Sequence, residues 1–235
     1  MRILITAGPT REHLDPVRFL SNRSTGKMGF SVARAAAEAG HSVTLIAGPV
    51  ALPTPPDVTR VDVVSACDML AALQRLLPAH DALVMTAAVA DWRPKICHSA
   101  KLKKRGMAPV LELEPNPDIL QTLKPEKGGR LFVGFAAETG DPLAEASRKL
   151  AAKGLDLMVA NDVSQPDAGF AVDTNRVTFI TPDAPPRPLP LLSKAEVGRE
   201  IIRWLETQSE RKAKGEKPPA RVNAGNVNEG YAGRG

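Results

Sequence analysis

Residues 20–30 combine the side-chain types that bind phosphate groups in α/β proteins. The segment, Leu-Ser-Asn-Arg-Ser-Thr-Gly-Lys-Met-Gly-Phe, supplies hydroxyl, amide and cationic groups just before a predicted helix. Backbone N–H groups in the first turn of a helix lack partners within it, and the helix dipole adds partial positive charge. Both effects stabilise an anion, so the segment predicts a phosphate site. The alternative is that Asn22, Ser24 or Thr25 only caps the helix.

The common nucleotide-binding fingerprints do not occur at this loop. Neither G-x-G-x-x-G nor G-x-x-x-x-G-K-[ST] is present, because Gly26-Lys27 is followed by Met28. The connection from the first predicted strand to the helix, residues 8–25, is also longer than the tight turn of a dinucleotide-binding fold. A standard dinucleotide site and a P-loop are therefore disfavoured.

Further polar groups follow other predicted strands. They stand in Ala87-Ala88-Val89-Ala90-Asp91, Ala136-Ala137-Glu138-Thr139 and Asn161-Asp162. Ligands of open parallel sheets lie outside the carboxyl ends of the strands, so these segments are expected around one cleft.

Two groups of lysines could meet a polyphosphate. Lys149 and Lys153 are four residues apart on a predicted helix and share a face. Lys101, Lys103 and Lys104 lie on a predicted hairpin. The alternative for both groups is a solvated surface.

Strand and helix signals alternate along the chain and predict an α/β fold of the Rossmann-like, three-layer type with a mostly parallel sheet. The expected strands are 2–7, 41–47, 58–64, 82–86, 131–135, 155–160 and 176–180. The expected helices are 27–40, 65–77, 142–153 and 194–206, with a short helix that has Pro117 at its first position. A flap at about residues 94–108, with a short antiparallel ribbon, is expected as an extension.

Composition fits one domain at residues 1–208 and a disordered tail at 209–235. The net charge of +5 suggests an anionic partner, but part of it lies in the tail, so nucleic acid is not implied. No apolar run is long enough for a bilayer and no secretory signal is seen, which predicts a cytoplasmic protein without membrane contact. Cys67 and Cys97 offer no disulfide framework.

Taken together, an ordered series of motifs resembles bacterial phosphopantothenate–cysteine ligase, also called phosphopantothenoylcysteine synthetase. The motifs are Ile5 to Arg11, Asp15 to Arg18, Ser21 to Gly29, Ala87 to Asp91, Lys101 to Lys104, Asn116 to Ile119, Gly134 to Thr139 and Ala160 to Val163. They cover roughly residues 2–205. In many bacteria this ligase follows a flavin-containing decarboxylase in one bifunctional protein. The chain resembles a separate or excised synthetase domain, so no flavin is expected in it.

The resemblance implies a step of coenzyme A biosynthesis. The carboxylate of 4′-phosphopantothenate attacks the α-phosphate of CTP, pyrophosphate leaves, and L-cysteine then attacks the acyl-cytidylate. Mg²⁺ or Mn²⁺ is expected to bridge phosphate oxygens. Such a reaction depends mainly on positioning and charge neutralisation.

The resemblance also implies a nucleotide site. The backbone of Met85, Thr86 and Ala87 is expected to read the cytosine edge, with Phe135 against the nucleoside and Asp91 near the ribose or the metal. The triphosphate is expected at Lys101, Lys149 and Lys153, and the turn that completes the site comprises Asn116, Pro117, Asp118 and Ile119.

For the acid substrate, the resemblance implies that Asn22 contacts the acyl-cytidylate and assists its conversion by cysteine, with Arg18 nearby. The flap would shield the intermediate from water. Its residues 96–100 depart from the proline- and glutamate-rich run of the family, which concerns flap length and closure. A homodimer is also implied, with sheet edges after residue 165 pairing across the interface.

Two alternatives of other classes remain at this point. An NAD(P)-dependent reductase fits the alternating pattern, but it lacks the glycine fingerprint. A basic nucleotide- or nucleic-acid-binding module fits the charge, but only 4% of the residues are aromatic and could stack on bases.

Overall fold

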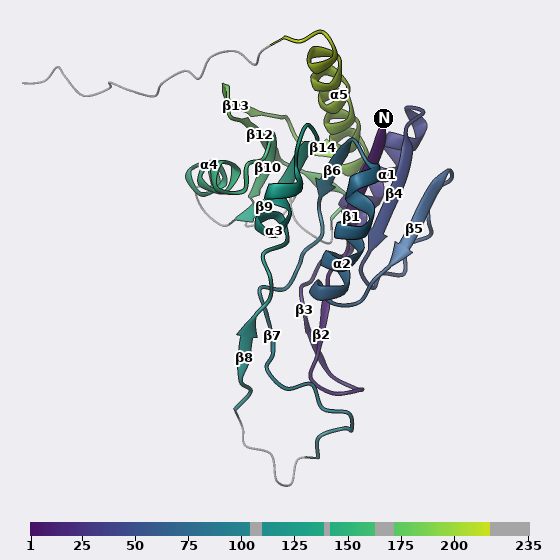
Figure 1. The fold of residues 1–235 in the computed structure, drawn as a ribbon, viewed down its shortest axis with the longest axis vertical. Helices are drawn as coiled ribbons and strands as arrows, with labels where there is room; N and C mark the ends of the chain where they lie inside the picture. Colours follow the sequence, from purple (N-terminus) through teal and green to yellow (C-terminus); the bar gives the residue numbers. More distant parts are fainter. Residues whose placement is uncertain (104–109, 139–141, 163–171, 217–235) are drawn as a thin grey trace, which may run out of the picture.

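The computed structural model describes residues 1–103, 110–138, 142–162 and 172–216 of the chain. Within these ranges, an eight-stranded sheet with the order β13-β12-β10-β9-β6-β1-β4-β5 forms the centre of the protein (Figure 1). Its strands are β1 (Arg2–Ala7), β4 (Ser42–Ala47), β5 (Val58–Asp62), β6 (Ala82–Met85), β9 (Leu131–Glu138), β10 (Leu157–Asp162), β12 (Val177–Thr181) and β13 (Ala184–Pro188). The predicted α/β fold with a mostly parallel sheet is confirmed.

The parallel strands follow the doubly wound order. β1 lies in the middle, with β4 and β5 added on one side and β6, β9 and β10 on the other, and all of these strands run parallel. β12 and β13 continue the sheet in antiparallel orientation. The winding changes direction between β1 and β6, and open sheets of this kind bind ligands at that point, beyond the carboxyl ends of the strands.

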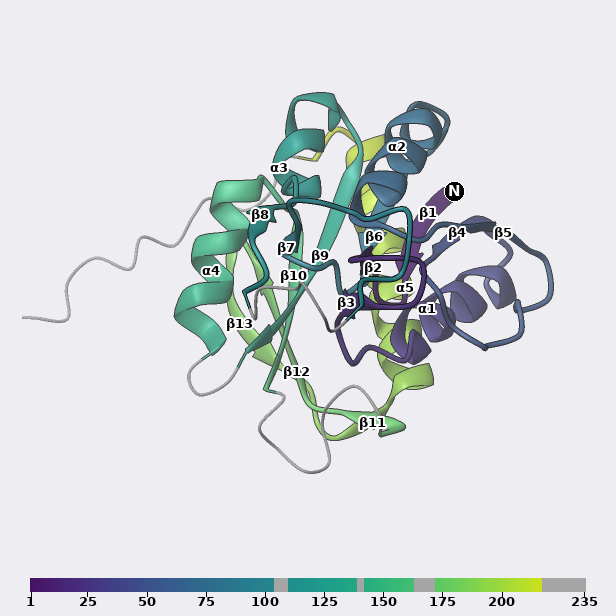
Figure 2. The ribbon, with the colours of Figure 1, turned by 90° about the horizontal axis from the view of Figure 1, so that it is seen from below.

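Helices cover both faces of the sheet, which makes three layers (Figures 1 and 2). On one face, α1 (Lys27–Glu38) and α5 (Lys194–Ala213) share a core with Ile3 and Ile5 of β1. On the other face, α2 (Ala66–Leu76), α3 (Ile119–Leu123) and α4 (Pro142–Lys153) share a second core with Leu4. Successive side chains of a strand point to opposite faces, so the apolar run of β1 supplies both cores.

The first turns of α1 and α2 differ in how their N–H groups are satisfied. α2 has a capping box between Ser65 and Asp68. The N-cap of α1 is Gly26, in a left-handed conformation with φ 79°, and it makes no side-chain capping bond. None of the polar residues before it is therefore the N-cap of α1, although the Ser24 hydroxyl accepts a hydrogen bond from the Gly26 N–H at 3.4 Å.

A long arm projects from the carboxyl-end side of the sheet (Figure 1). It consists of the hairpin β2 (Arg11–His13) and β3 (Phe19–Ser21) and the ribbon β7 (Trp92–Pro94) and β8 (Leu113–Pro115). We name these four strands with their connections the arm. The antiparallel ribbon was predicted, and its second strand begins at Leu113. The hairpin was not predicted, and residues 104–109 of the flap lie outside the described part.

Two predicted boundaries are wrong. Pro117 does not occupy the first position of its helix: α3 begins at Ile119, and the Asp118 carboxylate caps it by accepting a hydrogen bond from the Gln121 N–H at 3.1 Å. The last helix, expected to end at Glu206, continues to Ala213, so the predicted tail cannot begin at residue 209. Residues 217–235 of that tail lie outside the described residues.

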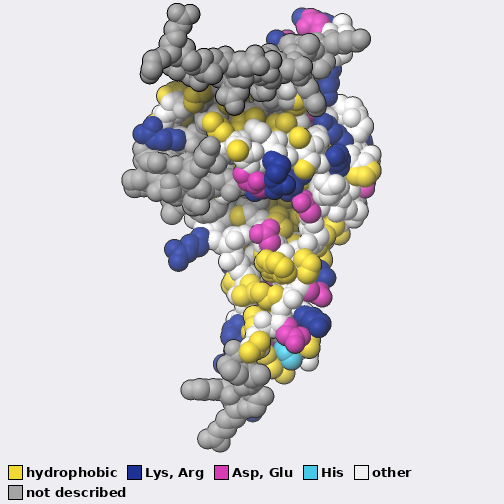
Figure 3. Space-filling view, turned by 90° about the vertical axis from the view of Figure 1, so that its left-hand side faces the viewer, with side chains coloured by type: hydrophobic (Ala, Val, Ile, Leu, Met, Phe, Trp, Pro, Cys, Tyr) yellow, Lys and Arg dark blue, Asp and Glu magenta, His cyan; other side chains and the backbone are white. Residues whose placement is uncertain are grey.

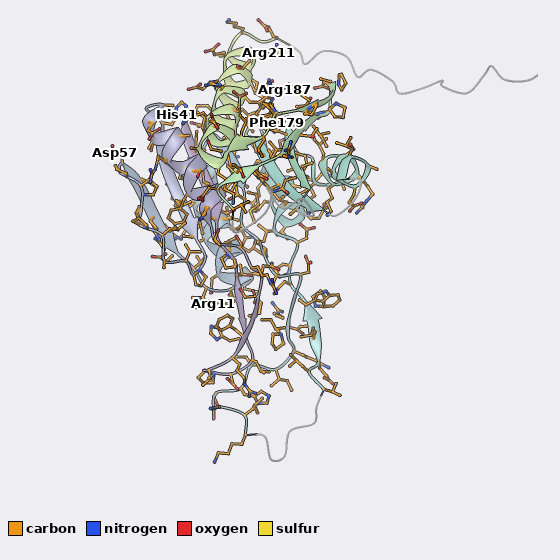
Figure 4. The ribbon with its side chains drawn as sticks, turned by 180° about the vertical axis from the view of Figure 1, so that it is seen from behind. Arg11, His41, Asp57, Phe179, Arg187 and Arg211 are labelled. Carbon is orange, nitrogen blue, oxygen red and sulfur yellow. The ribbon has the colours of Figure 1, made fainter. Side chains whose placement is uncertain are left out.

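The sheet ends at β13, an edge strand that the sequence did not reveal. Three of its residues are prolines, which lack the N–H that a strand ladder uses, so this edge is a poor template for further pairing. Arg187 of β13 makes a cation–π contact with β12, because its guanidinium carbon lies 5.2 Å from the centre of the Phe179 ring (Figure 4). Among the helices described, none has both the length and the apolar character that a bilayer crossing requires.

Gly29 lets α1 approach the sheet closely, and its replacement by alanine should destabilise the fold. A Cβ at this position would lie 2.5 Å from Ala7 Cβ and 2.8 Å from Thr6 O, and it would also collide with the Thr86 hydroxyl. Overpacking of this kind costs about 1–3 kcal/mol. We expect Gly29→Ala to lower the free energy of unfolding by about that amount, measured by urea denaturation.

Gly129→Ala is the matched control, since a Cβ there meets no atom within 4 Å. Equal stability of the two variants would mean that α1 does not need a glycine at its closest approach to the sheet.

Candidate active site

A cavity of about 410 Å³ lies at the carboxyl ends of the parallel strands. Its walls come from the start of α1, the segment after β6, the turn before α3, and the ends of β9 and β10. The structure brings together eleven of the predicted site residues here: Asn22, Met85, Thr86, Ala87, Asp91, Asn116, Pro117, Asp118, Ile119, Phe135 and Lys153. The shared cleft expected from the strand ends is found for Asp91, Ala136, Ala137 and Asn161, whereas the side chains of Glu138, Thr139 and Asp162 lie outside the described part of the chain.

Three predicted site residues do not line the cavity. Arg18 and Lys101 are exposed on the arm, and Lys149 lies on α4 with its Nζ 3.5 Å from Glu145 Oε1. Arg18 is held by Asp15, whose carboxylate is buried and lies 2.6 Å from Arg18 Nη2. This contact lowers the pKa of Asp15 far below its usual range, so the pair stays ionised at neutral pH. The predicted convergence of Lys101, Lys149 and Lys153 on one triphosphate is not seen within this subunit, because only Lys153 lines the cavity.

Asn22 is fixed in one orientation by two backbone carbonyls. Its Nδ2 donates to Ala88 O at 3.0 Å and to Val89 O at 3.1 Å. Both neighbours are acceptors, so the nitrogen must face them, and Oδ1 is the group left to meet a ligand. Asn22 therefore offers the cavity a hydrogen-bond acceptor.

Thr6, buried in β1, organises the segment predicted to read the base. Its hydroxyl accepts a hydrogen bond from the Ala87 N–H at 3.1 Å, and its carbonyl accepts one from the Thr86 hydroxyl at 2.5 Å. The Ala87 N–H and the Thr86 hydroxyl are thus engaged within the protein. Recognition of a base by this segment depends on its other backbone groups.

Two asparagines carry buried acceptors that have no partner among the described residues. These atoms are Asn116 Oδ1 and Asn161 Oδ1, and both residues line the cavity. Each amide nitrogen is already used: Asn116 Nδ2 donates to Ala90 O at 2.8 Å, and Asn161 Nδ2 donates to Asn175 Oδ1 at 2.8 Å. An unsatisfied buried acceptor is destabilising, so a ligand that brings donors or a cation is favoured here.

Lys153 is the cation nearest the turn before α3. Its Nζ lies 3.1 Å from Asp118 Oδ2, so one wall of the cavity presents a lysine and a carboxylate side by side. A phosphate chain would attract this ammonium group away from its partly exposed carboxylate partner.

Asp91 has few acidic neighbours. No cluster of three or more side chains suited to hold a metal ion occurs in the part of the chain that the structure describes. Asp91 and the free Asn116 oxygen are hard oxygen ligands of the kind that Mg²⁺ prefers. They fit an ion that takes most of its remaining ligands from phosphate and water.

Sequence reasoning missed two polar residues of the cavity wall, Asn175 and Lys194, and the apolar Leu120 beside the predicted turn. Lys194 is the first residue of α5 and only 5% exposed. Burial lowers the pKa of Lys194, and the nearby Lys27 lowers it further. A lysine opening a helix opposes the helix dipole, and that conflict was the signal in the sequence. Asn175 had no such signal.

The comparisons with known proteins show the family of this chain. The family model described as DNA/pantothenate metabolism flavoprotein C-terminal domain matches residues 1–208. Coenzyme A biosynthesis bifunctional protein CoaBC from Bacillus subtilis (strain 168) is 48% identical over 208 residues, covering 88% of this chain and 51% of that protein. The chain thus spans about half the length of the curated relatives it matches.

Solved structures give the same picture. The crystal structure of the C-terminal domain of a CoaBC protein matches with a TM-score of 0.77 and 45% identity, over 89% of this chain and 95% of that one. A Cab2 mutant in complex with phosphopantothenate-cysteine shares the fold, with a TM-score of 0.72 and 17% identity over 91% of this chain and 88% of that one. The chain belongs to the family of DNA/pantothenate metabolism flavoprotein C-terminal domains, the family that includes the C-terminal half of CoaBC.

Proposed function

We propose that the protein ligates 4′-phosphopantothenate to L-cysteine at the expense of CTP, forming phosphopantothenoylcysteine, CMP and pyrophosphate. The observation that carries this proposal is the cavity that joins Asn22, Lys153 and the uncapped start of α1. Family membership supports it, because the relatives are named for coenzyme A biosynthesis. The Cab2 mutant was solved in complex with phosphopantothenate-cysteine, which supports the acid and amino-acid substrates.

The first step activates the acid. A carboxylate oxygen of phosphopantothenate attacks the α-phosphorus of CTP, the bond from that phosphorus to the β-phosphate oxygen breaks, and pyrophosphate leaves. The protein has to align the two anions and neutralise their charge. Lys153 and the start of α1 can do this, because both border the cavity and the positive end of the helix dipole favours an anion.

The second step forms the amide. The cysteine nitrogen attacks the acyl carbon, the bond to the phosphate oxygen breaks, CMP leaves, and the amine proton passes to solvent. Asn22 Oδ1 is the acceptor that the cavity offers to an amine N–H, since Asn22 Nδ2 is held by two carbonyls. We assign Asn22 to positioning the amine, where a hydrogen bond from the N–H directs the nitrogen lone pair toward the acyl carbon.

Mg²⁺ or Mn²⁺ belongs to this proposal as a partner of the nucleotide. Asp91 and Asn116 Oδ1 are the groups that would hold it in this chain. When bound, such an ion neutralises phosphate charge.

We also propose a homodimer that forms through the arm. The arm carries a concentration of exposed large apolar side chains, namely Val17, Phe19, Trp92, Ile96, Val110, Leu111 and Leu113. Hydrophobic side chains gather on the face of the arm that Figure 3 shows. A patch of this kind marks an interaction surface. The predicted pairing of sheet edges after residue 165 is less favourable, because β13 is rich in proline.

An arm-mediated dimer would give a role to Arg18 and Lys101. Neither residue borders the cavity of its own subunit, and both lie on the surface that the dimer would use. In the dimer they would be available to the cavity of the second subunit.

Ile96→Asp should shift the protein from dimer to monomer in sedimentation velocity. Ile96 is 59% exposed on the arm, and a carboxylate buried there without a partner would oppose association. Leu191→Asp is the control, because Leu191 is 40% exposed but lies outside the arm. Retention of the dimer by Ile96→Asp, or its loss only in Leu191→Asp, would exclude the arm as the interface.

The ligase activity is tested by mixing the protein with CTP, Mg²⁺, phosphopantothenate and cysteine and measuring pyrophosphate. We expect pyrophosphate and phosphopantothenoylcysteine in equal amounts, and neither product without the acid substrate. Absence of both products from the complete mixture at micromolar enzyme would refute the proposed function. Binding of NADPH under the same conditions would favour the reductase alternative.

A further inference from the structure

The segment that follows β1 runs alongside the segment that follows β6, beyond the end of both strands. Pro9 and Ala88 form a parallel bridge there, and the Ala88 N–H donates to Gly8 O at 2.9 Å. Thr10 is the next residue of the first segment, and it is fully buried. It does not line the cavity, whereas Ala88 and Ala90, to which it is hydrogen-bonded, do. Thr10 therefore lies directly behind the cavity wall.

Thr10 uses three polar groups to join three stretches of the chain. Its hydroxyl accepts a hydrogen bond from the Ala90 N–H at 3.0 Å, and its own N–H donates to Ala88 O at 3.3 Å. Its carbonyl accepts a hydrogen bond from the hydroxyl of Ser21, the last residue of β3, at 2.8 Å. Thr10 thus ties the end of the β2–β3 hairpin, next to Asn22, to the segment after β6.

The peptide unit between Val89 and Ala90 is held at both ends. Its N–H, from Ala90, donates to the Thr10 hydroxyl. Its carbonyl, from Val89, accepts a hydrogen bond from Asn22 Nδ2 at 3.1 Å. A peptide unit is planar, so the direction of its N–H fixes the direction of its C=O. The Thr10 hydroxyl therefore helps to aim one of the two carbonyls that orient the Asn22 amide.

The other carbonyl is bonded to Thr10 directly. Ala88 O accepts a hydrogen bond from the Thr10 N–H and another from Asn22 Nδ2, the latter at 3.0 Å. Both partners of Asn22 Nδ2 are thus backbone atoms whose positions depend on Thr10. The direction in which Asn22 Oδ1 faces the cavity depends on the same two carbonyls.

We propose that Thr10 is a positioning residue for the second step of the reaction and that it acts on Asn22 through the peptide of Val89 and Ala90. Its hydroxyl satisfies the Ala90 N–H and so keeps the Val89 carbonyl directed at Asn22 Nδ2. Thr10 itself acts from outside the cavity wall. The kinetic consequence rests on the proposed function, whereas the control of the Asn22 orientation does not.

A purely structural role for Thr10 makes a different prediction. Loss of a buried hydroxyl that leaves an N–H unsatisfied is destabilising wherever it occurs. In that case Thr10→Val would lower the thermal stability, while the Asn22 amide and the balance between the two steps would stay as in the wild type. A measurement on Asn22 itself separates the two roles.

The first test is the ¹⁵N–¹H spectrum of the side-chain amides of the full chain. The Asn22 signals are identified by their absence from the spectrum of Asn22→Ala. Thr10→Val keeps the shape of the side chain but removes the hydroxyl. We expect it to shift the Asn22 signals toward those of solvent-exposed asparagines, because the hydrogen bond to Val89 O weakens. Thr10→Ser, which keeps the hydroxyl, should leave the signals at their wild-type positions.

Thr44→Val is the matched control for the loss of a threonine hydroxyl. Thr44 lies in β4, its hydroxyl is 3.0 Å from His80 Nε2, and it does not line the cavity. It should leave the Asn22 signals unchanged even if it lowers the melting temperature.

The second test is a double-mutant cycle on amide formation. We expect Thr10→Val to slow amide formation about tenfold to a hundredfold, as for a misplaced group at a reacting centre, while pyrophosphate is still released and the acyl-cytidylate accumulates. Because Thr10 acts through Asn22, the same change made in Asn22→Ala should have almost no further effect. Thr10→Ser should restore most of the rate. Rapid quenching and mass spectrometry measure the intermediate and the product.

Unchanged Asn22 signals in folded Thr10→Val would overturn the proposal. So would equal slowing of amide formation by Thr10→Val in the wild type and in Asn22→Ala, or shifted signals with a wild-type rate of amide formation. Thermal melting establishes that each variant is folded. If Thr10→Val does not fold, Thr10→Cys takes its place, because a thiol is only a weak acceptor.

Failure of the proposed function would be recognised separately. A wild type without ligase activity, whose Asn22 signals still depend on the Thr10 hydroxyl, would refute the proposed function and leave the control of Asn22 by Thr10 standing.

Discussion

Asn22→Ala is expected to accumulate the acyl-cytidylate, because activation of the acid continues while attack by cysteine slows. The Asn22 amide is oriented by Ala88 O and Val89 O so that only Oδ1 can accept the hydrogen bond of an amine. Loss of one oriented group of this kind lowers a reaction rate by about 10²–10³-fold. Rapid quenching followed by mass spectrometry should show the intermediate with the mass of acyl-CMP, together with a burst of pyrophosphate.

Ser21→Ala is the control for that experiment. Ser21 precedes Asn22 but does not line the cavity, and its hydroxyl donates to Thr10 O. It should form amide at nearly the wild-type rate. Equal loss of pyrophosphate release and of amide formation in Asn22→Ala would show that Asn22 serves activation, contrary to the division of labour proposed here.

Lys153→Met should weaken CTP binding strongly. Lys153 is the cation of α4 that borders the cavity, and a charged hydrogen bond to phosphate contributes about 1.5–3 kcal/mol. The KM for CTP is therefore expected to rise about tenfold to a hundredfold, with a much smaller change in the KM for cysteine. Initial rates over a range of CTP concentrations measure this directly.

Lys149→Met provides a matched comparison on the same helix. Lys149 lies beside Glu145, whose pKa is lowered to about 2 by Arg148 and also by Lys149, so the carboxylate is charged at neutral pH. We expect only a small effect on CTP binding from this variant. An effect as large as that of Lys153→Met would mean that α4 presents both lysines to the nucleotide in the working enzyme.

Much of the fold could be predicted from local patterns. The apolar run of β1, the capping box of α2 and the helical periodicity of α4 each carry their own signal, and these elements appear where expected. The hairpin of β2 and β3 could not be found in this way, because its strands are only three residues long and half of their residues are exposed. The strand β13 is made largely of proline, which usually argues against a strand.

The residues of the cavity could also be predicted only in part. The strand-end rule placed Asp91 and Asn161 around one cavity, because parallel strands end at the same edge. Helical spacing gave Lys149 and Lys153 a common face, but it could not tell which of them reaches the cavity, since that depends on where α4 lies on the sheet. Lys194 was missed for a related reason: its place in the wall depends on the packing of α5 against α1.

The direction in which the arm extends could not be predicted from the sequence. Lys101 stands in the lysine-rich segment Lys101 to Lys104 but does not line the cavity, and the β7–β8 connection that carries it belongs to the arm, which extends from the body (Figure 1). A sequence motif specifies residue types, whereas the direction of a long hairpin depends on contacts that are far apart in the chain. The Ile96→Asp experiment tests whether the arm brings Lys101 and Arg18 to the cavity of a second subunit.

The most direct test of the proposed chemistry uses phosphopantothenate labelled with ¹⁸O in its carboxylate. Attack of that carboxylate on the α-phosphorus and later expulsion of CMP would transfer one labelled oxygen to CMP, while the amide keeps the other. Mass spectrometry of the products should therefore find one ¹⁸O in CMP and none in pyrophosphate. Unlabelled CMP, with the ¹⁸O found in inorganic phosphate or pyrophosphate instead, would contradict activation through an acyl-cytidylate.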